Sequence, residues 1–175
     1  MRRVEARGAQ KPYRAGMYGG KFLPYHLGHL YCLETASRLC DVVYQILMVG
    51  CVDEDRIMAE DTALDKALLS PEARFEAMRS AGDRLGNVRT ILMDISACRT
   101  PGGEEDWDAE TPLVLEACGR FDAVFGSEPD YGAYFSRAYP WAEYVLVDPP
   151  RRAVPISGTM VRAMEAIQAK EWMTR

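Results

Sequence analysis

The sequence has little of what marks membrane, secreted or nucleic-acid-binding proteins. No stretch of the chain approaches the roughly twenty consecutive apolar residues that a membrane span needs, and residues 1–7 lack the apolar core of a signal peptide. Long runs of Lys and Arg are also absent, and the formal net charge is -5. A general nucleic-acid binder would carry a basic face instead. These absences predict a cytoplasmic protein that binds neither membranes nor nucleic acids.

Cysteine is scarce and is never arranged in a C-x-x-C pair, the spacing that zinc sites and dithiol motifs use. The cysteines are odd in number and scattered along the chain, which does not suit a disulfide framework. We therefore expect reduced thiols, most of them buried, and no metal bound by protein side chains. The five residues are Cys32, Cys40, Cys51, Cys98 and Cys118.

Strand-like and helix-like segments alternate along the chain. A length of 175 residues with 48% hydrophobic content fits one domain, residues 13–175, preceded by an extension over residues 1–12 that we expect to be flexible. The alternation predicts an α/β fold, a doubly wound, Rossmann-like parallel sheet of five strands. In such sheets a ligand binds at the carboxyl ends of the strands, where the strand order reverses. The predicted strands cover about residues 13–18, 42–49, 88–93, 122–125 and 144–147.

The helices carry their own signals. Apolar residues at helical spacing predict a helix over about residues 28–40. Another helix should begin after Ser70, a favoured N-cap residue that precedes a proline, and end near residues 82–86. A final helix should begin near Ser157. The polar, Gly-rich segment 99–106 predicts a mobile surface loop.

The chain has only two histidines, and both lie in one short segment where the first strand should give way to a helix. His26 and His29 follow a glycine pair and Lys21 within residues 19–29. The first N–H groups of a helix lack intrahelical partners, and the helix dipole adds positive potential there. Anions favour such a place. The segment therefore predicts a phosphate site at the end of the first strand.

A second cluster lies near the C-terminus. Within residues 151–162, Ser157 and Thr159 can offer hydroxyl and backbone N–H groups at a helix start, and Arg162 follows about one and a half turns later. Taken alone, this pattern also fits an ordinary capped helix with a surface arginine. Together with the histidine segment, it predicts a second phosphate-binding helix terminus, where an arginine can hold a polyphosphate.

The two clusters carry a family resemblance. His26-Leu27-Gly28-His29 resembles the H-x-G-H signature of the nucleotidyltransferase superfamily, and residues 156–162 resemble its I-S-x-T-x-x-R motif. Finer features resemble the nicotinamide mononucleotide adenylyltransferase domain of bifunctional bacterial NAD-biosynthesis and regulator proteins. These features are Gly20-Lys21-Phe22, Trp107, Phe125-Gly126-Ser127-Glu128 and Leu146-Val147-Asp148-Pro149. The resemblance covers about residues 13–162.

The resemblance implies transfer of AMP from ATP to nicotinamide mononucleotide, which gives NAD and pyrophosphate. His26 and His29 would stabilise the ATP phosphates, with His29 nearest the developing charge, and Lys21 and Arg162 would complete the catalytic set. Magnesium would enter with ATP, held mostly by phosphate and water. The remaining ATP-binding residues would be Tyr18, Gly19, Gly20, Phe22, Ser157, Gly158 and Thr159.

For the mononucleotide acceptor, Trp107 is the best candidate to stack on the nicotinamide ring, because a flat indole suits a cationic pyridinium. From sequence alone, a tryptophan packed over the sheet edge is equally compatible. Arg74, Ser127, Glu128 and Asp148 complete the predicted acceptor site. For Arg74, a solvated helix face is the stronger alternative. Asp53 and Asp61, after the second strand, fit either a ribose or metal contact or an ordinary loop role.

Several alternatives stay open. Cytidylyltransferases and pantetheine-phosphate adenylyltransferases of the superfamily are the nearest competitors, and a nucleotide-sensing protein without turnover is another. The chain lacks the helix-turn-helix and the G-x-x-x-x-G-K-[ST] kinase motif of the larger relatives, so we expect neither DNA repression nor kinase activity. After Arg162 it also departs from those relatives, which leaves a homo-oligomer possible but its interface undefined. The sequence does not distinguish the amide from the acid form of the acceptor.

Overall fold

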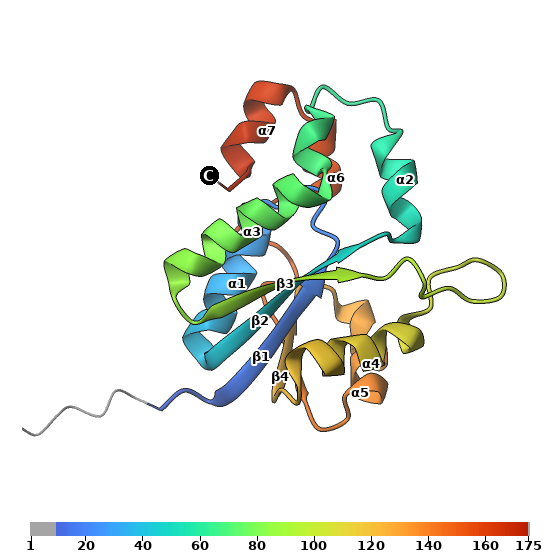
Figure 1. Ribbon diagram of the computed structural model, residues 1–175. Coiled ribbons are helices and arrows are strands. Elements are labelled where there is room, and N and C mark those ends of the chain that lie inside the picture. The colour runs from blue at the N-terminus through green and yellow to red at the C-terminus, as the bar shows by residue number, and fades with distance from the viewer. Residues whose placement is uncertain (1–9, 175) are drawn as a thin grey trace, which may run out of the picture.

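The computed structural model describes residues 10–174, which form a five-stranded parallel sheet in the order β3-β2-β1-β4-β5 (Figure 1). The predicted doubly wound α/β fold is confirmed, and each predicted strand agrees with the structure to within two residues at either end. The strands are β1 (Tyr13–Gly20), β2 (Cys40–Val49), β3 (Val88–Asp94), β4 (Ala123–Gly126) and β5 (Glu143–Leu146).

The strand order reverses between β1 and β4. The chain runs outward from β1 through β2 to β3, then returns to pair β4 with the other side of β1. The helices after β1 and β4 therefore leave on opposite faces, which opens a crevice above the carboxyl ends of these two strands. Gly20 and Gly126 are the last residues of β1 and β4, so both strands end on a glycine at this crevice.

Helices cover both faces of the sheet (Figure 1). On one face, α1 (Leu27–Leu39) and α3 (Pro71–Leu85) pack over the central strands, and on the other α4 (Trp107–Cys118) and α5 (Gly132–Ala138) do so. Parallel strands buried on both faces read as nearly continuous apolar runs, which is why β2 was recognisable in the sequence. All five cysteines are buried and free, as predicted.

A small third layer covers the carboxyl end of the sheet, where α2, α6 and α7 lie at the top of Figure 1. The helix α2 was not predicted. The predicted helix start near Ser157 is confirmed, but the backbone becomes extended at Met164 and separates two short helices. This break lets both helices place an apolar residue, Val161 and Ala169, in one cluster with Leu23 and Leu69. The elements are α2 (Val52–Met58), the 3-10 helices η1 (Lys66–Leu69) and η2 (Pro129–Tyr131), α6 (Gly158–Ala163) and α7 (Ala166–Trp172).

The predicted start of α3 is confirmed in detail. The hydroxyl of Ser70 accepts a hydrogen bond from the Ala73 N–H at 3.1 Å, and Pro71 occupies the first helical position, where its missing N–H costs nothing. The helix ends at Gly86, whose φ of 81° is the left-handed conformation that glycine adopts without strain. Local sequence therefore sets both ends of this helix.

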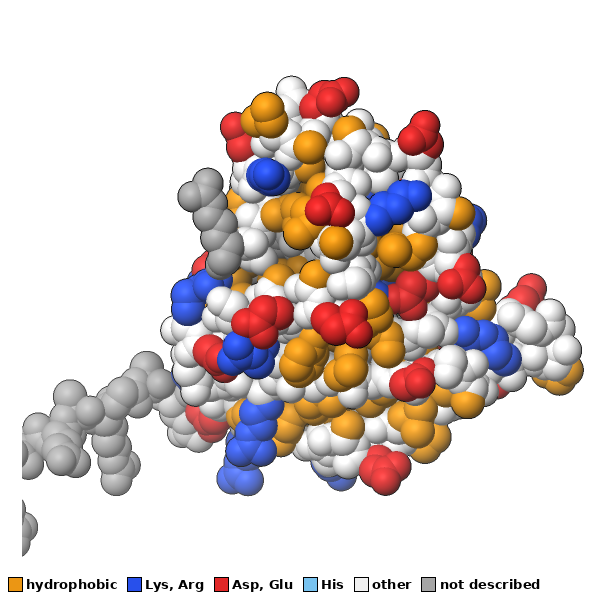
Figure 2. All heavy atoms as spheres, turned by 45° about the horizontal axis from the view of Figure 1, so that its top comes forward, with side chains coloured by type: hydrophobic (Ala, Val, Ile, Leu, Met, Phe, Trp, Pro, Cys, Tyr) orange, Lys and Arg blue, Asp and Glu red, His pale blue; other side chains and the backbone are white. Residues whose placement is uncertain are grey.

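The surface carries mixed charge. Over the face drawn in Figure 2, Lys and Arg side chains are interspersed with Asp and Glu side chains. No helix within residues 10–174 is long and apolar enough to cross a membrane. Of the predicted flexible extension, residues 1–9 lie outside the described part of the chain. Lys11 is tied down, because its amine donates to the carbonyls of Ser37 and Cys40 at 2.8 Å.

Candidate functional site

A cavity of about 240 Å³ occupies the crevice between the ends of β1 and β4. Most of the residues that the sequence analysis placed at the site contribute to its wall, from β1, the start of α1, the end of β4 and the loop after β5. Together they confirm that the crevice at the strand-order reversal is where the predicted residues meet. They are Tyr18, Gly19, Gly20, Lys21, Phe22, His26, His29, Ser127, Glu128 and Asp148.

The two histidines form the N-terminal cap of α1. His26 is the cap residue, and its Nδ1 accepts the Gly28 N–H at 3.1 Å, while the Nδ1 of His29 accepts the His26 N–H at 3.2 Å. Two backbone donors at the helix start are thus satisfied reciprocally, as in a capping box. Their rings stack with centroids 3.6 Å apart. Because each Nδ1 is an acceptor, each neutral ring carries its proton on Nε2.

The Nε2–H groups are the functional ends of these rings. The Nε2 of His26 is buried and has no hydrogen-bond partner, and both rings line the cavity. Burial, and then the nearby Arg151, lower the pKa of His26 to about 4. Burial first, then His26 and Arg151, also lower the pKa of His29. At neutral pH the site therefore offers neutral N–H donors, and one of them lacks the acceptor that a buried donor needs.

This pKa shift predicts how stability depends on pH. Below about pH 6.5 the unfolded chain protonates its histidines, whereas folded His26 stays neutral until about pH 4. As the pH falls from 6.5 to 4, proton binding therefore stabilises the unfolded state relative to the folded state. We expect the free energy of unfolding to fall by about 3 kcal/mol between these values because of His26 alone. Urea titrations at several pH values measure this loss.

The matched variant for that measurement is His26→Asn. Asparagine is a favoured N-cap residue, so its side-chain oxygen can replace Nδ1 while the titratable ring is removed. Ionisable groups far from this pair contribute equally to both proteins, whereas the pKa of His29 depends on its neighbour His26. The difference between the two pH profiles therefore reports His26 together with its effect on His29. Parallel profiles between pH 6.5 and 4 would contradict the assignment of a buried neutral imidazole.

Backbone strain is concentrated around the same cavity. Within residues 10–174, three residues other than glycine have positive φ angles: Phe22 at 50°, Asp148 at 46° and Arg151 at 52°. All three line the cavity. Such conformations are costly for residues with a Cβ and gather at binding and catalytic sites. Asp148 secures its turn by accepting the backbone N–H groups of Arg152 and Ala153, so its carboxylate is largely engaged in the loop.

Arg151 is a site residue that the sequence analysis did not assign. Its guanidinium donates to the carbonyl of Ile156 at 2.7 Å and forms an ion pair with Glu128, both at the cavity wall. The sequence offered a signal, because Arg151 opens the cluster that contains Ser157 and Arg162. Its role depends on the loop conformation, which spacing alone does not predict. It is the arginine that brings positive charge to the histidines.

A second cavity, of about 250 Å³, adjoins the first on the side of α4 and α5. Trp107, the first residue of α4, lies in its wall, 37% exposed and edge-on to the rings of Tyr131 and Tyr134. This indole is therefore partly accessible, while its edge packs against two tyrosines. The two cavities share the wall residues Gly19, Gly20, Lys21, Tyr131 and Phe135.

Lys21 lies where the cavities meet. Its amine donates to Glu105 at 2.8 Å and lies 3.6 Å from Asp53. Glu105 lies in segment 99–106, which was predicted to be a mobile loop. The base of that segment is anchored, because the side chain of Arg99 hydrogen-bonds to the backbone carbonyls of Ile95 and Cys98 at 3.1 and 2.9 Å, while the loop tip is exposed. Lys21 is thus held in place at the shared wall.

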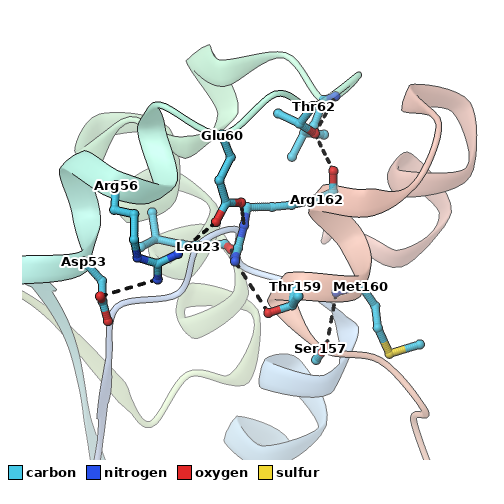
Figure 3. A network of polar contacts seen from close by, with 10 residues as sticks. Leu23, Asp53, Arg56, Glu60, Thr62, Ser157, Thr159, Met160 and Arg162 are labelled. Atoms are coloured by element: carbon cyan, nitrogen blue, oxygen red, sulfur yellow. Dashed lines mark hydrogen bonds and ion pairs between the residues drawn. The ribbon is translucent and has the colours of Figure 1, made fainter.

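The C-terminal motif lies next to the histidine segment, but its polar side chains do not line the first cavity. Ile156 lines the cavity, and a Cβ on Gly28 would come within 3.3 Å of it. Ser157 caps α6 by accepting the Met160 N–H at 3.2 Å, and Thr159 is exposed (Figure 3). A Cβ on Gly158 would lie 2.8 Å from the carbonyl of Leu23, so only glycine allows this approach.

Arg162 is already engaged in the structure. Its Nε donates to Glu60 at 2.8 Å and its Nη1 to the carbonyl of Leu23 at 2.6 Å, while the side chain is 10% exposed (Figure 3). Thr62 in turn donates to the backbone carbonyl of Arg162. These contacts link α6 to the segment after α2. Arg162 is therefore paired with Glu60 in the structure and lines neither cavity.

The structure contradicts both sequence-based predictions for Arg74, the acceptor site and the solvated helix face. Arg74 neither lines a cavity nor faces solvent, since only 1% of it is exposed. Its guanidinium forms an ion pair with Glu54 and donates to the carbonyl of Lys21 at 2.7 Å. A buried guanidinium needs such partners. Arg74 thus holds the turn after β1 in place through its bond to Lys21. Helical spacing indicates which residues share a face of α3, and it does not indicate this distant contact.

Asp53, on α2, and Asp61, in the segment after it, do not line either cavity. Asp53 pairs with Lys21 and Arg56, and Asp61 is exposed. Throughout residues 10–174, no group of three or more His, Cys, Asp and Glu side chains is placed to hold a metal ion.

The chain is similar in sequence to two curated proteins. The trifunctional NAD biosynthesis/regulator protein NadR of Escherichia coli is 29% identical over 154 residues, which cover 84% of the chain and 36% of the relative. A phosphopantetheine adenylyltransferase of Rhodopirellula baltica is 35% identical over 79 residues, or 45% of the chain and 37% of the relative. The chain thus matches little more than a third of either protein. No protein-family model matches it.

Solved structures share the fold. NadR in complex with NAD and AMP-PNP aligns with a TM-score of 0.57 and 21% identity, over 86% of this chain and 42% of that one. A bifunctional NMN adenylyltransferase/ADP ribose pyrophosphatase from Francisella tularensis aligns with a TM-score of 0.59 and 20% identity, over 86% and 41%. The chain thus carries segments that resemble the H-x-G-H and I-S-x-T-x-x-R motifs of the nucleotidyltransferase superfamily, and it shares the fold of these solved structures.

Proposed function

We propose that the chain is an adenylyltransferase that transfers AMP from ATP to nicotinamide mononucleotide, giving NAD and pyrophosphate. The observation that carries the proposal is the pair of adjoining cavities. One holds the histidines and the other holds Trp107, and they share the segment Gly19–Lys21. A dinucleotide has this shape, with two ring systems joined by phosphates. The shared segment is then where the new bond forms.

In this reaction a phosphate oxygen of the mononucleotide attacks the α-phosphorus of ATP. The bond from that phosphorus to the oxygen bridging to the β-phosphate breaks, and pyrophosphate leaves with the bonding electrons. The attacking phosphate is already ionised, so no general base is required. Catalysis then depends on positioning and on neutralising charge in the transition state.

The residues of the first cavity suit that task. The Nε2–H groups of His26 and His29 would donate to phosphate oxygens as charge builds up, and the buried Nε2 of His26 would gain its missing partner. Lys21 would meet the phosphates at the shared wall, and Arg151 would add positive charge. Magnesium would enter with ATP, its coordination sphere completed by phosphate oxygens and water.

Arg162 would bind the β- and γ-phosphates only after leaving Glu60. The Glu60→Gln variant removes the competing charge and should therefore lower the KM for ATP. We expect a change of about two- to fivefold, because an ion pair with a partly exposed partner is worth no more than about 1 kcal/mol. Initial rates at varied ATP concentration measure it. Glu72→Gln, on the exposed start of α3, is the control, and an unchanged or higher KM for Glu60→Gln would argue against phosphate binding by Arg162.

The second cavity favours a mononucleotide with a flat cationic ring. Trp107 can stack on such a ring, and Glu105 and Glu110 in the same wall make the cavity acidic, which suits a pyridinium. Phosphopantetheine is the second candidate acceptor, because one sequence relative is named for that activity. Phosphopantetheine has no aromatic ring to stack on the indole of Trp107.

A pyrophosphate-release assay with ATP and a panel of acceptors tests the proposal. The panel contains nicotinamide mononucleotide, its acid form, phosphopantetheine and a sugar phosphate. We expect turnover with a mononucleotide and formation of the dinucleotide, identified by mass spectrometry. Turnover with phosphopantetheine alone would replace the proposed acceptor. ATP binding without turnover on any acceptor would point instead to a nucleotide-sensing protein.

A further inference from the structure

The second cavity contains a carboxyl group that has more to offer a ligand than its charge. Glu110 lies on α4, is only 6% exposed and contributes to the cavity wall. Its Oε1 is buried and has no hydrogen-bond partner. A buried polar atom without a partner is costly unless a ligand or water satisfies it. Glu110 is therefore placed to receive a ligand atom.

The position of Glu110 on its helix directs it to the same ligand as Trp107. The two residues are three apart on α4, so their side chains lie on the same face of the helix. Both line the second cavity, together with apolar side chains such as Met48 and Val114. A ring stacked on the indole would thus bring its substituent toward the carboxyl group.

Charged neighbours surround Glu110. Burial, and then Glu105, raise its pKa to about 7, while Lys21 and Arg99 oppose the shift and Asp106 adds to it. Of the two cations, Lys21 is already paired with Glu105. The tyrosines of the opposite wall, Tyr134 and Tyr139, lie on α5 and just after it. The charged groups that line the cavity beside Glu110 are therefore the paired Lys21 and Glu105.

We propose that Glu110 selects the amide form of the mononucleotide acceptor over its acid form, by hydrogen bonding to the carboxamide in the second cavity. The inference rests on the proposed function and adds to it the choice that the sequence left open.

The selection follows from what each acceptor offers. A carboxamide donates N–H bonds, which the Glu110 carboxyl accepts whether it is protonated or ionised. A carboxylate donates nothing, and it can meet Glu110 only while Glu110 carries a proton. With Glu105 close by, a second ionised carboxylate would also be repelled. The preference for the amide should therefore grow as the pH rises through about 7, where Glu110 loses its proton.

The test compares kcat/KM for nicotinamide mononucleotide and nicotinic acid mononucleotide, in wild type and in Glu110→Gln, from pH 6 to 9. Glutamine keeps the shape of the side chain but cannot ionise and can donate to a carboxylate. We expect the amide-to-acid ratio to fall about tenfold or more in the variant, as for loss of one charge-assisted hydrogen bond. We also expect the rise of the ratio with pH to disappear. Glu116→Gln, exposed on the same helix, is the control.

The outcomes separate this inference from the proposed function. Turnover of mononucleotides with no preference for the amide, or with a preference that Glu110→Gln and pH leave unchanged, would overturn the role of Glu110 and leave the adenylyltransferase intact. Equal losses for both acceptors would mean that Glu110 supports only the fold, and would overturn the inference too. No turnover of either mononucleotide, with turnover of phosphopantetheine, would overturn both.

Discussion

Replacing His29 with asparagine should lower kcat by about 100- to 1,000-fold while changing the dissociation constant for ATP only a few-fold. Asparagine places its side-chain oxygen close to the position of Nδ1, so it can still accept the His26 N–H and preserve the start of α1. It removes the Nε2–H donor. If that donor acts on charge that develops in the transition state, the loss appears in turnover and not in ground-state binding.

Three measurements make this prediction specific. Single-turnover rates with saturating ATP report the chemical step, calorimetry reports ATP binding, and thermal unfolding checks that the helix start is intact. His29→Gln is the matched variant, because its amide reaches the position of Nε2 and should restore part of the rate. Equal losses in turnover and ATP affinity would show that His29 binds the ground state, and our assignment would then be wrong.

The second large effect concerns stability. Arg74→Met should lower the free energy of unfolding by about 3–5 kcal/mol, the usual result of removing one partner of a buried ion pair. Methionine fills much of the space but leaves Glu54 without its cation. It also removes the donor to the Lys21 carbonyl at 2.7 Å. The turn that carries the site then loses its support from α3.

Urea unfolding measures this loss, and Arg79→Met is the control. Arg79 lies on the exposed face of the same helix, where it pairs with Glu76 and Asp83, so its replacement should change stability little. Glu54→Gln provides a milder second variant, since an amide can still accept from Arg74. If Arg74→Met and Arg79→Met unfolded at similar urea concentrations, Arg74 would not be the buried support described above.

Much of the fold could be predicted because its signals are local. The apolar run of β2 reflects burial on both faces, and Ser70 and the following proline mark a helix start whatever the rest of the chain does. The alternation of such segments then allows few topologies, because parallel strands need helical crossovers. The segment between β2 and α3 was missed, since α2 is only seven residues long and has no side-chain cap.

The candidate site was predicted less evenly. The residues from Gly19 to His29 and Ser127, Glu128 and Asp148 meet at one cavity, because they follow strands that end at the same edge of the sheet. The sequence did not indicate which of three arginines line the site. Arg74 is buried under the site, Arg151 lines it, and Arg162 is paired beside it, each through contacts with residues distant in the chain.

The sequence by itself determined the superfamily motifs, the alternation of strands and helices, and the edge of the sheet at which the site lies, because these depend on neighbours along the chain. Only the tertiary structure decided the state of each charged group. The neutral N–H donors of His26 and His29, the pairing of Arg162 with Glu60, and the unpartnered carboxyl of Glu110 all depend on burial and on partners from other elements. Desolvation and charge pairing act through space, so spacing along the chain carries no record of them.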